Sequence, residues 1–250
     1  MSLEIKIIGI KGIPKVEPGD DIADLIIDSI NQGINLMDKD IIVVTHKIVS
    51  KAEGRLIDLK KINPSDFALK ISKRRKKDPR MVEVILREAK RIVRMERGVI
   101  IAETRHGFVC ANAGVDKSNV KGEDTVSLLP MDPDKSARRI RDEIKRRLSI
   151  DVAVVISDTF GRPWREGQTN IAIGVAGLEP MLDYRGKKDS YDYTLKVTAI
   201  AMADELASAA ELVMGKVGMV PVAIVRGYQY TEKEGSIKSL IRPRSRDLFR

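Results

Sequence analysis

The clearest strand signal in the chain is Val152-Ala-Val-Val-Ile-Ser157, which runs directly into the polar residues Asp158 and Thr159. A short apolar run of this kind is typical of a strand buried inside a sheet. Ile5–Ile10 alternates like a second strand, and Asp40–Thr45 forms another apolar run. Predicted helices separate these strands, so the pattern indicates an α/β or mixed α+β fold.

The predicted order of elements gives one unit over residues 1–250, with two lobes dividing near residue 150. Asp78-Pro79 is expected to begin a helix that runs to about Met95, and Asp158–Asn170 is expected to be a polar loop. Hairpin-like segments around residues 98–111 predict mixed and antiparallel sheets. The chain has neither a Gly-x-x-x-x-Gly-Lys-[Ser/Thr] nor a Gly-x-Gly-x-x-Gly motif, so the fold is expected to be neither P-loop nor Rossmann.

The charge balance favours anionic partners. Forty-five Lys and Arg against 36 Asp and Glu give a net charge of +9. Four Phe, one Trp and five Tyr are few for a protein that stacks nucleic-acid bases, and the basic run Lys73–Lys77 is expected to be solvated surface at a helix end. The chain lacks an apolar run long enough for a membrane span, and Ile5–Ile10 is not the apolar block of a secretory signal, so a cytoplasmic protein is expected.

The supply of soft ligands restricts the metal chemistry. One cysteine, Cys110, and two histidines, His46 and His106, are too few for the usual structural zinc site. A bound metal would therefore need hard oxygen ligands, which suit Mg²⁺, Mn²⁺ or Ca²⁺.

Four clusters of polar residues are candidates for chemistry, each with a simpler alternative. Asp158 and Thr159 at a strand end could hold a metal, with Arg162 and Arg165 on anionic oxygens; the alternative is a helix cap and solvated arginines. In Ala111–Asn119, Asp116 could bind a metal and Asn119 a nucleotide, or both could serve a loop turn. The third cluster is His46, Lys47 and Lys51, which could bind phosphate or form a surface turn. The fourth is Asp183–Tyr193 with Arg185, which could bind an anionic substrate or be a mobile loop.

These motifs resemble the coenzyme F420-0:L-glutamate ligases, the γ-glutamyl ligases of a deazaflavin coenzyme. The resemblance spans nearly the whole chain in order. It rests on Val44–Arg55, Ala111–Asp116, Ser157–Arg165, Asn170–Gly177, Ala203–Ala207 and Val220–Gly227.

The resemblance implies a homodimer that uses GTP to add L-glutamate to F420-0, with two divalent metals, Mn²⁺ or Mg²⁺, and K⁺ as a candidate activator. It implies Asp116, Asp158 and Thr159 as metal ligands; Asp116, Asp158 and Lys51 are the expected catalytic residues. The implied nucleotide contacts are Lys11, Gly12, Ile13, Pro14, His46, Lys47, Lys51, Asn119, Gly215, Lys216 and Val217.

Two departures from the family pattern affect these expectations. Some relatives carry a further C-terminal nitroreductase-like domain, which is not expected here because the chain ends at Arg250. The loop Met214–Met219 lacks the acidic residue of the short archaeal members, so a second metal ligand is not assigned there.

The expected mechanism transfers the γ-phosphoryl group of GTP to the coenzyme carboxylate, and the glutamate amine then attacks the acyl phosphate. Two alternatives use the same residues differently. A metal-dependent phosphatase or nucleotide hydrolase would consume GTP without glutamate, and a basic nucleic-acid binding protein would show salt-sensitive affinity for any polyanion.

Overall fold

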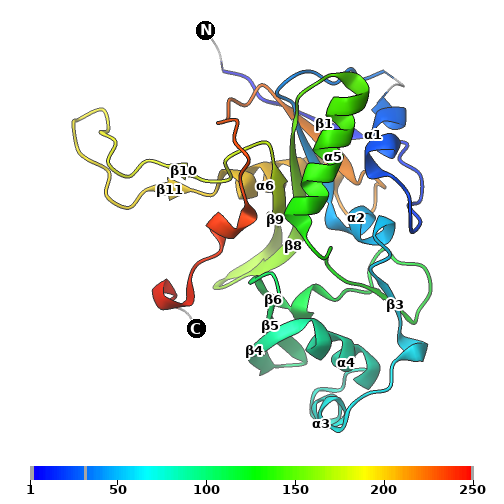
Figure 1. Cartoon of the computed structure of the whole chain (residues 1–250). Helices are drawn as coiled ribbons and strands as arrows, with labels where there is room; N and C mark the ends of the chain where they lie inside the picture. The colour runs from blue at the N-terminus through cyan, green and yellow to red at the C-terminus, as the bar shows by residue number, and fades with distance from the viewer. Residues whose placement is uncertain (1–2, 31–32, 249–250) are drawn as a thin grey trace.

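A computed structural model of the chain describes residues 3–30 and 33–248, and a five-stranded sheet lies at its centre (Figure 1). The strand order is β1-β12-β2-β8-β9. Only β2 and β8 pair in parallel, while the other three neighbouring pairs are antiparallel. It follows that β1, β2 and β8 all run in the same direction. The strands are β1 Lys6–Ile10, β2 Ile41–Thr45, β8 Ala153–Arg162, β9 Arg165–Ala176 and β12 Val222–Arg226.

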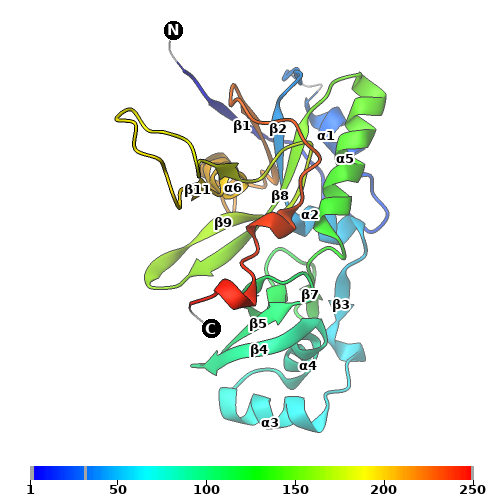
Figure 2. The same ribbon diagram turned by 60° about the vertical axis from the view of Figure 1, so that its left-hand side comes forward.

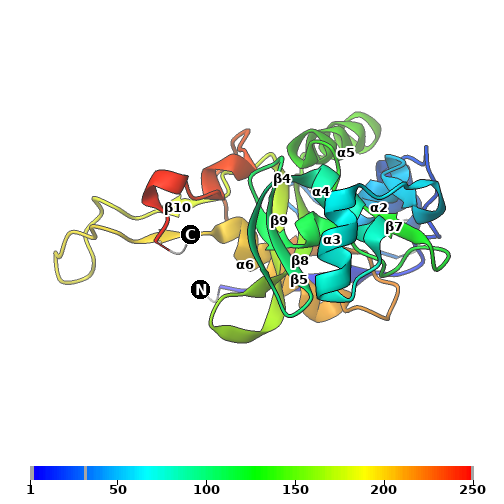
Figure 3. The same cartoon turned by 90° about the horizontal axis from the view of Figure 1, so that it is seen from below.

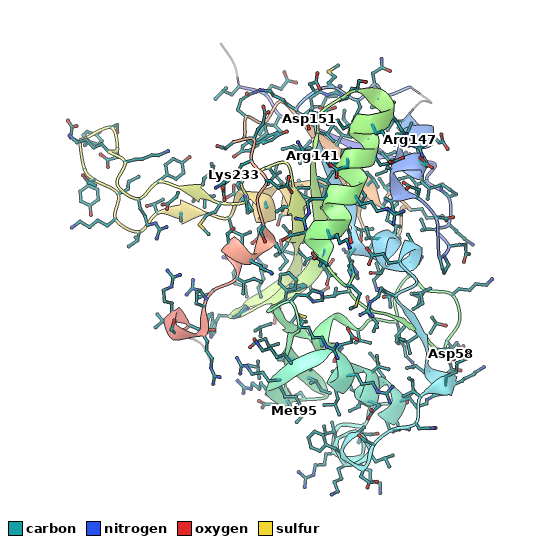
Figure 4. The ribbon with its side chains drawn as sticks, in the orientation of Figure 1. Asp58, Met95, Arg141, Arg147, Asp151 and Lys233 are labelled. Atoms are coloured by element: carbon teal, nitrogen blue, oxygen red, sulfur yellow. The ribbon has the colours of Figure 1, made fainter. Side chains whose placement is uncertain are left out.

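Helices cover both faces of this sheet, as Figures 1 and 3 show. On one face α5 Pro133–Leu148 packs on β8 and β9, with α1 Ile22–Ile30 beside it; on the other, α6 Met202–Met214 packs on β9, β12 and β1. Arg141 of α5 donates to Val152 O (3.0 Å) and Asp151 Oδ1 (2.8 Å), which joins α5 to the start of β8 (Figure 4). The large hydrophobic core lies between these layers.

A second hydrophobic cluster is built from residues 59–128, which lie between β2 and β8 in the sequence and below the main sheet in Figure 2. Residue 150 lies between α5 and β8, and the residues on both sides of it belong to the large hydrophobic core. The boundary between the two clusters is therefore not at residue 150. The helix α2 His46–Ala52 precedes this region. Its elements are β3 Leu56–Asp58, α3 Asp66–Arg75, α4 Pro79–Glu88, β4 Ala89–Glu96, β5 Val99–Thr104, β6 Val109–Ala111 and β7 Thr125–Ser127.

The prediction of one helix from Pro79 to about Met95 is wrong. The helix α4 ends at Glu88, and the chain becomes the strand β4, which pairs with β5. Arg97 and Gly98, both with positive φ, form the tight turn between the two strands. The apolar spacing of the helix continues into β4, so the periodicity alone did not mark this boundary.

The predicted polar loop over residues 158–170 is also wrong. The strand β8 continues through Asp158 to Arg162, turns at Pro163-Trp164, and returns as β9 from Arg165. Exposed polar side chains cover the outer part of this hairpin, so it lacks the apolar pattern by which the inner strands were found. Asp158 and Thr159 therefore lie within a strand.

Two further segments extend from the body. A long arm carries the short strands β10 Leu182–Asp183 and β11 Ala199–Ile200, and it projects sideways in Figure 1. The C-terminal segment with its short 3₁₀ turns, Ile237–Leu240 and Arg244–Arg246, folds back beside the β8–β9 hairpin (Figure 2). Among the described residues, no helix is long and apolar enough to cross a membrane.

Candidate active site

Most of the predicted site residues gather at one end of the central sheet. Because β1, β2 and β8 run in the same direction, the residues that follow or end them meet at the same edge: Lys11–Pro14, His46–Lys51, and Asp158. The loop before β12 reaches this edge as well, because the Thr45 N–H donates to Pro221 O (2.9 Å). The topology thus unites segments that are more than 200 residues apart in sequence.

The buried His46 and the partly exposed Asp158 form a pair at the centre of this edge. His46 is the first residue of α2 and is 2% exposed, and its Nε2 lies 3.1 Å from Asp158 Oδ1. The other ring nitrogen, Nδ1, lies 3.3 Å from Ser50 Oγ, one turn along the same helix. Burial raises the pKa of Asp158, but the facing His46, the Thr159 N–H and the charge of Lys47 outweigh it and hold the pKa below its usual value. Asp158 is therefore a carboxylate at neutral pH.

Lys47 and Asp116 form the second pair. Lys47 Nζ donates to Asp116 Oδ2 (2.7 Å) and to Ser127 Oγ (2.8 Å). Asp116 accepts two further hydrogen bonds from Ser118 and exchanges backbone hydrogen bonds with Ser127. Burial alone would raise the pKa of Asp116, but Lys47 and Ser118 lower it to about 2. The Lys47 charge thus lowers the pKa of both Asp116 and Asp158.

Lys51 lies one helical turn after Lys47, so the predicted pair of lysines does share one helix. Burial, and then the nearby Lys47 charge, lower the pKa of Lys51. Two cations held close together without full solvation favour an anion between them. In the loop after β1, Lys11, Gly12 and Pro14 are exposed, whereas the Ile13 side chain packs into the core.

The backbone before Asp116 is strained. Asn112, Ala113 and Gly114 have φ values of 54°, 53° and 74°, which is a left-handed turn. Lys77 Nζ donates to Asn112 Oδ1 (2.6 Å), and burial lowers the pKa of Lys77. The expectation that the whole run Lys73–Lys77 is solvated is therefore wrong for Lys77, which steadies this turn.

A third group of polar side chains lies around Thr159. Thr159 Oγ1 donates to Asn170 Oδ1 (2.7 Å), and Asn170 Nδ2 donates to Glu211 Oε2 (2.8 Å). Lys216 Nζ donates to Thr159 Oγ1 and lies 3.1 Å from Glu211 Oε1. Sequence reasoning assigned no role to Glu211 or Asn170; the position of Asn170, opening the apolar run of β9, was the one available signal.

The oxygen-rich donor set is compatible with a hard cation. In the described part of the chain, no three His, Cys, Asp or Glu side chains surround one point, so a cage made entirely of such ligands is absent there. The Lys216 ammonium instead occupies a place among the oxygens of Thr159, Asn170 and Glu211. Carboxylates that are few in number and close to phosphate oxygens are the usual setting for Mg²⁺.

Some predicted site residues do not join this cluster. Arg162 donates to the backbone of Glu166 (2.7 Å) in its own turn, and Arg165 is exposed at the same hairpin end. Arg185 pairs with Asp183 on the projecting arm (Figure 1). Asn119, Gly215 and Val217 are exposed in loops, and Asn119 has a positive φ of 56°.

Cys110 lies beside the site without taking part in its polar network. Burial, together with the Asp158 charge, raises the pKa of its thiol to about 12. A thiol that stays protonated is not a nucleophile at neutral pH. The strand β6, which carries Cys110, contacts β8.

Comparison with known proteins identifies the family. The model of the F420-0:Gamma-glutamyl ligase family matches residues 9–227. A coenzyme F420:L-glutamate ligase from Methanothermobacter thermautotrophicus is 50% identical, covering 98% of this chain and 99% of its own. Ligases of the same name from Methanopyrus kandleri and Methanocaldococcus jannaschii are each 48% identical, covering 94% and 85% of both chains, respectively. The chain whose sheet edge carries the His46–Asp158 and Lys47–Asp116 pairs is thus an enzyme of the F420-0:gamma-glutamyl ligase family.

Proposed function

We propose that this enzyme joins L-glutamate to coenzyme F420-0 and uses GTP to activate the coenzyme carboxylate. The family and the names of its relatives support the ligase reaction. The observation that carries the nucleotide part is the set of cations at the sheet edge: Lys47 pairs with Asp116, Lys51 lies one turn later on the same helix, and Lys216 donates to Thr159, the residue after Asp158.

The reaction requires two nucleophilic displacements, one at the γ-phosphorus of GTP and one at the acyl carbon. An oxygen of the F420-0 carboxylate attacks the γ-phosphorus of GTP, forming the acyl phosphate, and GDP leaves. The unprotonated amine of glutamate then attacks the acyl carbon, the amide forms, and inorganic phosphate departs as the amine loses its proton. Both steps build negative charge on phosphate oxygens, so positioning and charge neutralisation supply most of the catalysis.

The residues divide this work. Lys47 and Lys51 are placed to bind phosphate oxygens, and His46 fixes the orientation of the Asp158 carboxylate. Asp116, Asp158 and Thr159 would hold Mn²⁺ or Mg²⁺, which supplies positive charge to the phosphate oxygens when bound. We also propose that K⁺ activates the enzyme and that the enzyme is a homodimer. Light scattering of the purified chain tests the dimer.

The direct test incubates the purified chain with GTP, Mn²⁺, glutamate and F420-0, and weighs the products by mass spectrometry. The proposal predicts one GDP and one phosphate per amide formed, and no amide when GTP or the metal is omitted. Release of phosphate from GTP without glutamate, at the same rate, would instead support the hydrolase. Amide formation from another triphosphate but not from GTP would contradict the nucleotide assignment.

A further inference from the structure

Two adjoining hollows lie on the outer side of β9, at the first turn of α6. The larger has a volume of about 500 Å³, and its lining includes Ile171, Ala199, Ala201, Asp204, Glu205 and Ser208. The small and apolar side chains of this lining form one wall of the hollow, and the carboxylates of Asp204 and Glu205 lie on the opposite wall.

The smaller hollow has a volume of about 190 Å³ and shares Ile171 and Asp204 with the larger one. Its other walls are mostly apolar and partly aromatic, and they include one basic residue, Arg242. Phe108 directly precedes β6, belongs to the large hydrophobic core and meets Phe160 edge to face, with ring centroids 6.2 Å apart. The C-terminal segment closes the remaining side with Ile237 and Leu240. Because Ile171 and Asp204 are common to both, the hollows form one continuous surface.

This surface begins one strand away from the candidate active site. Ile171 on β9 lies directly opposite Asp158 on β8, so their side chains share one face of the hairpin. Phe160, two residues after Asp158, is on that face too. A substrate lying in the hollows could therefore extend a chemical group to Asp158.

Asp204 is the polar group that both hollows share. Its Oδ1 accepts a hydrogen bond from Ala172 N (2.9 Å), and within the described residues the structure shows no partner for Oδ2. Asp204 is half-buried, and burial raises its pKa although the Ala172 N–H lowers it in part. A carboxyl group in apolar surroundings is suited to accept a hydrogen bond from a neutral N–H donor.

Charge and shape together distinguish the three proposed substrates. Asp204 and Glu205 repel the phosphates of GTP, and the apolar walls would leave the charged groups of a small molecule such as glutamate poorly solvated. A flat ring that presents an N–H group at one edge meets both the apolar walls and the Asp204 carboxyl group. Deazaflavin rings carry a pyrimidinedione edge with such an imide N–H.

We propose that the two hollows bind the deazaflavin ring of F420-0, with Asp204 accepting a hydrogen bond from the imide N–H of the ring. This inference rests on the proposed ligase function and names the residues that hold the aromatic part of the acceptor. The anionic tail of the coenzyme would then lead across Ile171 toward Asp158.

Guanine also presents an N–H edge and is therefore a rival occupant of the hollows. The residues proposed to bind the nucleotide do not line the hollows, however. The helix α6 runs from Asp204, over β9, to Met214, near β1, a path of about 15 Å. Lys11–Pro14 follows β1, which lies at the opposite side of the sheet from β9 and the hollows, whereas in the loop after α6 the Lys216 side chain reaches back to Thr159 on β8. The geometry therefore favours the deazaflavin over guanine.

The test compares steady-state constants and calorimetric binding for Asp204→Asn, Ala199→Trp and wild type. Asp204→Asn keeps an acceptor for Ala172 N, and Ala199→Trp fills the larger hollow from an exposed strand. Each variant should raise the KM and Kd for F420-0 about tenfold or more and leave the KM for GTP and glutamate within about twofold. Asp28→Asn on α1 and Leu3→Trp at the exposed N-terminal segment are the matched controls and should behave as wild type.

The outcomes are distinct. An unchanged Kd for F420-0 in both variants, with wild-type thermal unfolding, would overturn the ring site. A selective rise in the KM for GTP would assign the hollows to guanine instead, and a selective rise for glutamate would assign them to the amino acid. If wild type forms no amide at all, the proposed function fails, whereas a change confined to F420-0 binding by the variants supports the ring site.

Discussion

Lys47 Nζ lies 2.7 Å from Asp116 Oδ2, and this ion pair joins the two hydrophobic clusters at the site. Lys47 is on α2 at the end of β2, whereas Asp116 follows β6 and pairs through its backbone with Ser127 of β7. The Lys47 side chain is 12% exposed. The ammonium group is therefore held in one place, between the sheet edge and the second cluster, before any substrate binds.

Replacing this ammonium should reduce ligation strongly. In Lys47→Met, the phosphate oxygens lose a fixed cation, and kcat/KM for GTP should fall about 100-fold, as when one fixed electrostatic donor is removed. Lys70→Met on α3, an exposed lysine outside the site, is the matched control. Activity within a few-fold of wild type, with normal thermal unfolding, would contradict the role of Lys47.

The acid stability of the protein should depend on Asp116. Its pKa is lowered to about 2 in the folded protein, from an ordinary 3.8. A lowered pKa stabilises the folded state above about pH 4, and that contribution is lost as the pH falls toward 2. The difference in the free energy of unfolding between wild type and Asp116→Asn should thus be larger at pH 5 than at pH 2.5. Urea titrations at both pH values measure it, and an equal difference would show that Asp116 is not paired in solution.

The left-handed turn before Asp116 should depend on Gly114. A Cβ atom at Gly114 would lie 2.6 Å from Cγ of Leu129, which is 2% exposed and has no room to move. Gly114→Ala should lower the free energy of unfolding by about 3 kcal/mol through this overlap and the positive φ. Gly54→Ala also has a positive φ but open space around it, and should cost about 1 kcal/mol. Equal costs in chemical denaturation would mean that the Leu129 contact is relieved.

The inner strands could be predicted from the sequence because burial on both faces leaves an unbroken apolar pattern, as in Val152–Ile156. The outer part of the β8–β9 hairpin could not, since its side chains are polar and exposed and leave no apolar pattern. In β4, the apolar spacing of the preceding helix continued into the strand. The turn at Arg97-Gly98, not the periodicity, sets that boundary.

The meeting of His46 with Asp158 follows from the parallel pairing of β2 and β8, which polar residues at two strand ends suggested. The position of Glu211 depends on the angle at which α6 packs on the sheet. That angle cannot be predicted from the local sequence. The arginines Arg162 and Arg185 looked equally suitable as anion ligands, but backbone geometry directs them to their own turns.

Glu211 gives the remaining prediction, because it holds Lys216 and Asn170 beside Thr159. In Glu211→Gln, Asn170 keeps an acceptor but Lys216 loses its anionic partner, so kcat/KM for GTP should fall about tenfold. Lys216 is 55% exposed, and an exposed ion pair contributes little to stability, so the unfolding temperature should hardly change. Glu96→Gln, at the end of β4, is the control for the same replacement. If Glu211 acts by positioning Lys216, the double variant with Lys216→Met should be no worse than Lys216→Met alone. Multiplied losses in the double variant would instead show that Glu211 acts on the substrate or its cation independently of Lys216.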